Sequence, residues 1–275
     1  MPINRCHYLS RTLALLVILA ASAAPAGAAC SRTIVVPASP TGYSVIARGA
    51  AVSGAIPDML RTLGARDGCT FAFPVMPRAR MAYQFLQSGE ADIMVPASRS
   101  AERDLQATFV PMMKWKVELI ALTTRAIGAR SVEALLADKQ LRGVFVRSYV
   151  FGDAYNAMLR QLEAERRIYY ANDLAGVARM LKAGRADFTV NVSALFLSTL
   201  ASDAAMQADA ALFAAQPLPG MPLTESGAYV SRRSLKPADQ AALRALLAES
   251  AHGALWQQLQ KYYPPALLKS AVQPH

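Results

Sequence analysis

The chain has 275 residues, of which 53% are hydrophobic and 17% charged, and this composition excludes a disordered chain and predicts one large domain or two smaller ones. Its formal net charge is +10, a charge that suits either a nucleic-acid partner or an anionic ligand. The basic residues are spread along the chain, with no basic block and no strip interleaved with aromatic residues, and this pattern argues against nucleic acid.

The first predicted element is a cleaved signal peptide over residues 1–28. Arg5 and Arg11 give a basic start, residues 13–24 form an apolar run, and Ala26-Gly27-Ala28 supplies small residues for cleavage. The alternative is an uncleaved membrane anchor, although the apolar run is too short to span a bilayer comfortably. Cleavage would place the mature protein in the periplasm. It also removes two arginines and no acid, so the net charge falls from +10 to +8.

The cysteines are predicted to form a disulfide. Cys6 leaves with the signal peptide, so Cys30 and Cys69 remain in an oxidising compartment. Each stands just before a strand-like run, residues 33–36 and 70–73. If these strands are parallel neighbours, the two cysteines meet at one edge of the sheet. The alternative is lipidation of Cys30, which follows three small residues.

Two β-α-β units are predicted in the first part of the mature chain. Strands and helices alternate over residues 33–36, 54–64, 70–73, 80–88 and 91–97. Apolar residues at helical spacing mark the two helices, and Gly89 stands where a helix most often ends. Two such units in succession favour a parallel sheet.

A second alternating set follows, over residues 118–123, 131–137, 143–147, 152–166, 168–170, 173–182 and 187–192. Both sets close alike, with a helix ending at glycine, then Ala-Asp and a strand: QSGEADIMV at 87–95 and KAGRADFTV at 182–190. A strand at 228–231 and helices at 237–249 and 254–262 then follow. The predicted domains are the signal peptide 1–28, lobe 1 (29–117 with 219–275) and lobe 2 (118–218), joined by short hinge strands.

Six short motifs follow the signal peptide in order: Gly54–Leu60 (GAIPDML), Gly89–Asp92 (GEAD), Ser98–Arg103 (SRSAER) with Phe109 after it, Leu141–Gly143 (LRG), Gly184–Asp187 (GRAD) and Gly253–Tyr263. With these motifs the chain resembles the bacterial periplasmic solute-binding proteins of family 3, which include the polar amino-acid receptors of ABC transporters. The resemblance implies an α/β fold of type II, with two lobes that are each a mostly parallel sheet flanked by helices and joined by a two-strand hinge. It also implies a monomer that closes around a small-molecule ligand and delivers it to a membrane ABC permease.

The resemblance assigns ligand-binding roles in lobe 1. Arg103 matches the family arginine that grips an α-carboxylate, a role that suits the paired donors of a guanidinium. Ser98 matches a residue that contacts the ligand, and Arg78 aligns with an aromatic position, so charge replaces stacking here. Arg99 is either a further ligand cation or a solvated surface residue. Tyr43 is either a ring against the ligand or a buried core residue.

In lobe 2, Ser148 and Tyr149 are predicted to line the site, in the turn before the helix that starts near Gly152; amides at such a helix start can hold an anion. Amino-acid receptors of the family commonly carry an aspartate for the ligand ammonium where this chain has Val192. Asn191 is the only polar group adjacent to that position. The missing carboxylate, together with the arginines of lobe 1, predicts an anionic ligand, such as a carboxylate without an ammonium.

Two other functions compete with a transport receptor. An enzyme on the same scaffold, like a cyclohexadienyl dehydratase, would need a general acid or base in the cleft. Glu102, Asp153 and Glu225 lie in suitable loops but form no recognisable constellation, so the chain is predicted not to be an enzyme. A sensor that feeds a signalling partner is the other alternative. No metal-ligand spacing or phosphate-binding glycine loop occurs, so neither a metal nor a cofactor is predicted.

Overall fold

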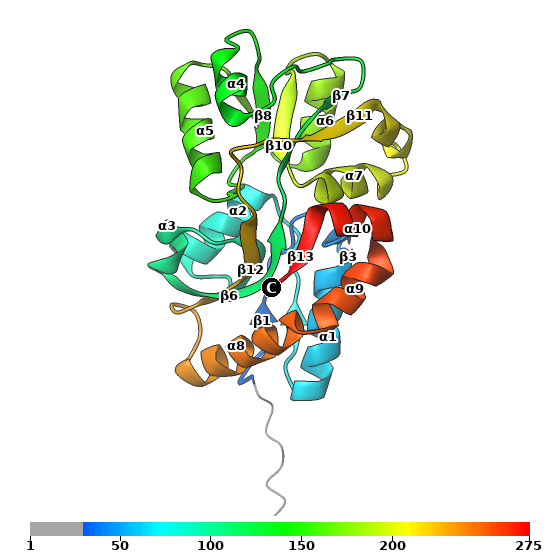
Figure 1. The fold of residues 1–275 in the computed structure, drawn as a ribbon. Helices are drawn as coiled ribbons and strands as arrows, with labels where there is room; N and C mark the ends of the chain where they lie inside the picture. Colours follow the sequence, from blue (N-terminus) through cyan, green and yellow to red (C-terminus); the bar gives the residue numbers. More distant parts are fainter. Residues whose placement is uncertain (1–29) are drawn as a thin grey trace, which may run out of the picture.

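The computed structural model describes residues 30–275, and the predicted signal peptide at 1–28 lies outside the described residues. Figure 1 shows two lobes stacked end to end, with α4 to α7 in the upper lobe and α1, α8 and α9 in the lower one. Within residues 30–275, no helix has both the length and the apolar character needed to cross a membrane.

The main sheet of the lower lobe has four strands in the order β13-β6-β12-β5. They are β5 (Ile93–Ser98), β6 (Ala107–Trp115), β12 (Thr224–Ser231) and β13 (Val272–Pro274), and all of their pairings are antiparallel. Beside it, β1 (Ile34–Val35) pairs in parallel with β4 (Phe71–Ala72), and β2 (Ile46–Arg48) pairs antiparallel with β3 (Ala51–Ser53). The expectation of parallel strands therefore fails for the four-stranded sheet, because β6 leaves for the upper lobe and β12 returns from it.

The helices of the lower lobe pack around this sheet. They are α1 (Ala55–Asp67), α2 (Arg78–Tyr83) with a π-helical continuation (Gln84–Ser88), α3 (Ala101–Asp104), α8 (Pro237–Ala251), α9 (Ala254–Tyr262) and α10 (Pro265–Ala271). The predicted end of a helix at Gly89 is confirmed. This glycine adopts a left-handed conformation (φ 72°), which suits a residue without a Cβ.

The upper lobe contains a five-stranded sheet in the order β11-β7-β10-β8-β9. The strands are β7 (Glu118–Leu122), β8 (Gly143–Val146), β9 (Ile168–Ala171), β10 (Phe188–Asn191) and β11 (Phe213–Pro217). β8 pairs in parallel with β9 and β10, whereas β7 pairs antiparallel with β10 and β11. The accompanying helices are α4 (Val132–Ala137), α5 (Asp153–Ala164), α6 (Leu174–Lys182), α7 (Ser193–Ala201) and a 3₁₀ helix (Gln207–Leu212).

The chain passes between the lobes at residues 116–117, which join β6 to β7, and at 218–223, which join β11 to β12. The C-terminal segment braces the first of these passages. The N–H of Lys116 donates to the carbonyl of Ala271 at 2.9 Å, and β13 pairs with the end of β6 at Trp115. Helix α10 also packs against α7 of the upper lobe. Three stretches of chain therefore meet at the junction between the lobes.

The repeated Ala-Asp sequence serves the same structural purpose in both lobes. Asp92 is buried and accepts hydrogen bonds from the Val35 N–H at 2.8 Å and from the Arg32 guanidinium at 2.6 Å. Asp187 accepts from the Arg142 N–H at 2.6 Å and pairs with Arg125 at 2.5 Å. Charge-assisted bonds of this kind are the stronger class. Each aspartate therefore ties the strand that follows it to the start of a neighbouring strand.

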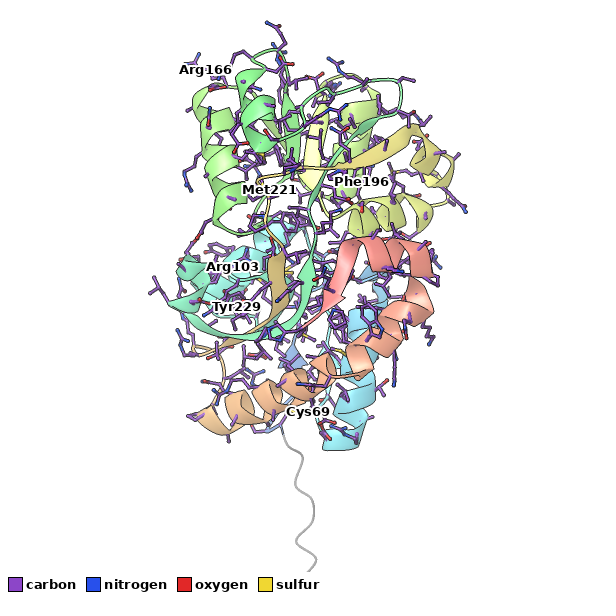
Figure 2. The ribbon with its side chains drawn as sticks, in the orientation of Figure 1. Cys69, Arg103, Arg166, Phe196, Met221 and Tyr229 are labelled. Atoms are coloured by element: carbon purple, nitrogen blue, oxygen red, sulfur yellow. A yellow bond between two sulfur atoms is a disulfide. The ribbon has the colours of Figure 1, made fainter. Side chains whose placement is uncertain are left out.

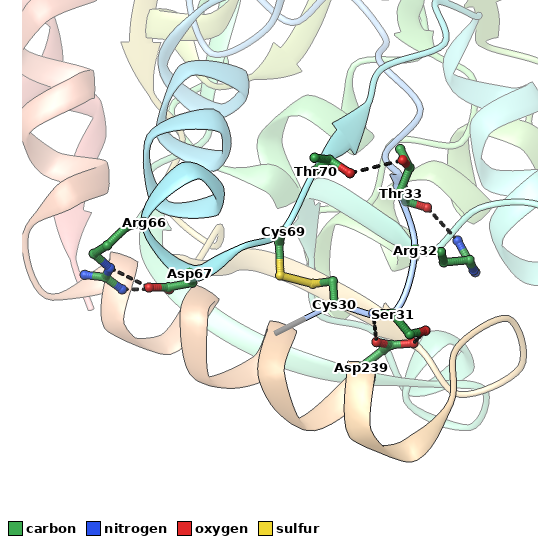
Figure 3. The surroundings of a disulfide bond; sticks show 9 residues. All are labelled: Cys30, Ser31, Arg32, Thr33, Arg66, Asp67, Cys69, Thr70 and Asp239. Atoms are coloured by element: carbon green, nitrogen blue, oxygen red, sulfur yellow. Dashed lines mark hydrogen bonds and ion pairs between the residues drawn. A yellow bond between two sulfur atoms is a disulfide. The ribbon is translucent and has the colours of Figure 1, made fainter. Parts of the chain in front are cut away.

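A disulfide joins Cys30 and Cys69, as the sequence predicts, and both cysteines are buried. Strands β1 and β4 pair in parallel with Ile34 opposite Phe71, which brings the two cysteines together at one edge (Figure 3). The bond spans 39 positions of the chain. Closing a loop of that length stabilises the fold by about 4 kcal/mol when the loss of unfolded-chain entropy is counted.

Candidate functional site

A cavity of about 30 Å³ lies between the two lobes. The lower lobe contributes Thr41, Arg78, Pro96, Ala97, Ser98, Trp115 and Ser226, and the upper lobe contributes Tyr149, Val150, Phe151 and Leu195. Most of these residues stand at the ends of strands β5, β6 and β8 or at the starts of helices α2 and α7. The volume holds roughly two water molecules, far less than a typical ligand pocket, so the lobes are nearly closed on each other.

Arg78 is a buried cation on the wall of this cavity. It begins α2 directly after Pro77 and is only 5% exposed. Its Nη2 donates to the carbonyl of Pro96 at 2.9 Å, and its guanidinium lies 5.5 Å from the centre of the Tyr149 ring. Its Nε has no hydrogen-bond partner. Burial lowers the pKa of Arg78, because no carboxylate within residues 30–275 pairs with its charge.

Arg103 is a second buried cation, 4% exposed, on the short helix α3. Its Nη1 donates to the carbonyl of Ser98 at 3.0 Å, and its Nη2 donates across to the carbonyl of Ser148 in the upper lobe at 3.3 Å. Burial, and then the charge of Arg78, lower the pKa of Arg103 to about 10. An arginine guanidinium is effectively always protonated in proteins, so both groups are cations at neutral pH, and the charge of Arg78 makes the protonated form of Arg103 less favourable.

Tyr229 holds α3, the helix that carries Arg103, in place beside the cavity. The tyrosine lies on β12 in the lower lobe, close to Arg103 in Figure 2, and is fully buried. Its hydroxyl donates to the Asp104 carboxylate at 2.8 Å and accepts from the Ser100 N–H at 2.9 Å. The Ser100 hydroxyl in turn caps the helix by accepting the Arg103 N–H. The arginine therefore rests on a helix that is fixed at its start and along one side.

The wall of the cavity carries no counter-charge to the arginines. Of the residues that line it, none is an aspartate or glutamate, and none is a histidine. Its other titratable group is Tyr149, and burial raises the pKa of that phenol, so it remains neutral. Buried charge without a partner is energetically costly. The arrangement is chemically suited to an anion, which would neutralise the guanidinium groups and accept hydrogen bonds from their unpaired N–H groups.

The structure brings five of the eight predicted site residues together. Arg78, Ser98 and Tyr149 line the cavity, and Arg103 contacts the carbonyls of Ser98 and Ser148 beside it. Ser148 adopts a positive φ of 68° in the turn before α5, and its carbonyl accepts the bond from Arg103. Their roles in ligand binding stay predictions, but their proximity is a property of the fold.

The other three predicted site residues lie away from the cavity wall. The ring of Tyr43 packs edge-on against Tyr263, with ring centres 5.5 Å apart. Arg99 is exposed, with 58% of its side chain accessible, and forms an ion pair with Asp104 at 3.0 Å. Asn191 is buried, and its Oδ1 accepts the N–H of Val192 at 2.8 Å. In each case, local packing or pairing directs the side chain elsewhere.

Sequence reasoning did not find several residues of the cavity wall, among them Thr41, Trp115, Phe151, Leu195 and Ser226. Trp115 had no signal in the sequence, because the strand that it ends, β6, was not predicted. Phe151 follows Tyr149 in the same turn, and its carbonyl accepts the hydroxyl of Thr224 at 2.9 Å. Leu195 had no such signal, since helix α7 was not predicted.

Within residues 30–275, no group of three or more histidine, cysteine, aspartate or glutamate residues is placed to hold a metal ion. The predicted acid or base candidates Glu102, Asp153 and Glu225 are not among the residues of the cavity wall. Glu225 instead lies 3.8 Å from Arg99 and 3.4 Å from His275 at the surface.

Comparison with known proteins supports the fold. No protein-family model matches the chain, and no curated protein matches it in sequence. A histidine kinase sensor domain with similarity to periplasmic binding proteins is 18% identical, with 88% of this chain and 98% of that chain covered and a TM-score of 0.64. An amino-acid ABC transporter substrate-binding protein from Streptococcus pneumoniae, bound to L-arginine, is 17% identical, with coverage of 84% and 93% and a TM-score of 0.65. An ancestral amino-acid-binding protein, a precursor of cyclohexadienyl dehydratase, is 16% identical, with coverage of 84% and 95% and the same TM-score of 0.65.

Proposed function

We propose that this chain, which has the two-lobed fold of the periplasmic binding proteins, is a periplasmic receptor for a small anionic solute that bears a carboxylate. The solute binds between the lobes at Arg103 and Arg78 and is delivered by a monomeric receptor to an ABC permease. The observation that carries the proposal is a pair of buried arginines, Arg78 on the cavity wall and Arg103 beside it on the carbonyl of Ser98. Neither arginine has a carboxylate partner within residues 30–275.

Arg103 is placed to couple binding to closure of the lobes. Its guanidinium already bridges them, through the carbonyls of Ser98 below and Ser148 above. An anion on this guanidinium would offset its desolvation in the closed form more than in an open, solvated form. Differential affinity of that kind is what allows a ligand to shift a conformational equilibrium.

Charge also indicates what the site rejects. A free amino acid would bring an ammonium group that needs a carboxylate, and the cavity wall has none. A basic amino acid would add a further cation beside Arg78 and Arg103, at a cost in repulsion. The neighbour that binds L-arginine is therefore a guide to the fold of this chain and not to its ligand.

The proposal is tested by thermal-shift and calorimetric titration of the purified protein with monocarboxylates, dicarboxylates, L-glutamate and L-arginine. We expect at least one acid without an ammonium to raise the melting temperature by mass action, and L-arginine to have no effect. The Arg103→Met variant should lose the effect, because removing one partner of a buried charge pair costs about 2–5 kcal/mol of binding energy, which is about 30-fold or more in affinity.

The matched control is Arg99→Gln, which removes a nearby but exposed arginine and should keep the full thermal shift. Tight binding of L-arginine, or an unchanged shift in Arg103→Met, would contradict the proposed site and its charge preference.

A sensory role is the second candidate, because the chain also has the fold of a histidine kinase sensor domain. The same ligand-driven closure would then act on a signalling partner in place of a permease. Catalysis is not proposed, since no acid or base candidate from the sequence lines the cavity. Conversion of a bound acid by the purified protein, followed by mass spectrometry, would contradict this assignment.

A further inference from the structure

We infer that the ligand is a short dicarboxylate without an amino group, with one carboxylate on Arg103 and the other on Arg78. The inference rests on the proposed function, because it concerns the same cavity. It goes further by assigning an anion-binding role to Arg78 and by setting the number of acidic groups on the ligand.

The first argument is charge balance. Arg78 and Arg103 are each at least nine-tenths buried, and a guanidinium keeps its charge at neutral pH. One carboxylate neutralises one of them and leaves the other as an uncompensated buried cation. A dianion neutralises both, which is the arrangement that buried charges require.

The second argument is the spacing of the two arginines along strand β5. Arg78 is anchored to the carbonyl of Pro96, and Arg103 to the carbonyl of Ser98, two residues further along. A strand advances by about 3.3 Å per residue, so the anchor points are about 7 Å apart. Each guanidinium can therefore face its own carboxylate. Arg78 keeps an unbonded Nε–H for that purpose.

The third argument is the apolar part of the cavity wall. Pro96, Trp115, Phe151 and Leu195 present carbon surface there. Sulfate and phosphate have oxygens on every side, and each of them needs a donor when it is buried. A dicarboxylate places a hydrocarbon linker against these residues and confines its oxygens to the arginines.

The size of the cavity limits the length of the linker. With room for about two water molecules in this arrangement, every diacid needs the lobes to part or the Arg78 side chain to move, and each added methylene needs a wider opening. We therefore assign the ligand to the series from malonate to glutarate.

The test compares each diacid with its monoamide, which has nearly the same size and one charge fewer. Malonate, succinate and glutarate are titrated by calorimetry against malonamate, succinamate and glutaramate at one ionic strength. The wild-type protein should prefer the best diacid over its monoamide by about tenfold or more. In Arg78→Met this preference should disappear, whereas Arg99→Gln should retain it. Sulfate and phosphate should bind more weakly than the best diacid.

The outcomes separate this inference from the proposed function. If a monoamide or propionate binds as tightly as the diacids, both arginines share one carboxylate: the inference is wrong and the anion receptor stands. If Arg78→Met keeps the preference for the diacid, the inference is wrong and the receptor for a carboxylate stands. If sulfate or phosphate binds best, the inference fails together with the carboxylate preference of the proposed function. If none of the diacids binds but a monocarboxylate does, only the inference fails. If no acid binds and L-arginine does, both fail.

Discussion

The Arg78→Met variant is expected to be more stable than the wild-type protein when neither contains ligand, with a gain of about 1–4 kcal/mol in the free energy of unfolding. Arg78 has a desolvated charge, an unpaired Nε and one hydrogen bond to a protein oxygen, the carbonyl of Pro96. Losing that bond leaves a carbonyl unpaired at a cost of about 1–3 kcal/mol. Desolvating an unpaired charge costs several kcal/mol, so removing the buried charge has a larger effect than leaving the carbonyl unpaired.

Urea denaturation of extensively dialysed protein measures this difference. Arg99→Met provides the matched control, because its side chain is 58% exposed and surface substitutions usually change stability by about 0.5 kcal/mol or less. A stability gain together with a loss of anion binding is the signature of a residue kept for ligand binding. A destabilised Arg78→Met variant would show instead that this arginine supports the fold.

The Gly42→Ala variant is expected to bind anions about tenfold or more weakly, because its lobes cannot close fully. Gly42 lies in the lower lobe with a φ of 56°. A Cβ built on it would lie 2.0 Å from Ser198 Oγ and 2.7 Å from the carbonyl oxygen of Leu195, both on helix α7 of the upper lobe. Because the second atom belongs to the backbone, relief requires the lobes to move apart, and overpacking of this kind costs about 1–3 kcal/mol.

Gly49→Ala is a closely matched control. Gly49 has almost the same φ, 61°, but a Cβ there meets nothing within 4 Å. Both variants therefore carry the strain of a left-handed alanine, and only Gly42→Ala carries the clash. Small-angle X-ray scattering should show a larger radius of gyration for Gly42→Ala in saturating ligand. Equal affinities for the two variants would mean that close contact between Gly42 and α7 is not needed for binding.

The parts of the fold that the sequence predicts best are those with local signals. Both Ala-Asp sequences lead into strands, and Asp92 and Asp187 make equivalent bonds in the two lobes. Strand β6 was not predicted, because it contains Pro111 and its partner β12 lies more than a hundred residues later in the chain. The antiparallel character of the four-stranded sheet depends on that distant pairing, so it could not be read from successive β-α-β units.

In the site, too, features with local sequence signals could be predicted and features set by tertiary contacts could not. The proximity of Arg78 and Arg103 could be predicted, because each lies at or near the end of a predicted strand and such ends meet at one edge of a sheet. Their ligand-binding roles stay predictions. The positions of Tyr43 and Arg99 were left as alternatives, and the structure places both away from the cavity, against Tyr263 and Asp104. Which way a side chain points at such positions depends on tertiary neighbours, which single-residue patterns do not specify.

The central claim is that a small anion binds between the lobes at the two buried arginines. Native mass spectrometry of the mature protein, purified from the periplasm without refolding, tests it most directly. We expect a complex that releases a small diacid without an amine, and Arg103→Met purified in the same way should carry none. A basic amino acid released from the wild-type protein, or the same acid retained by Arg103→Met, would contradict the claim.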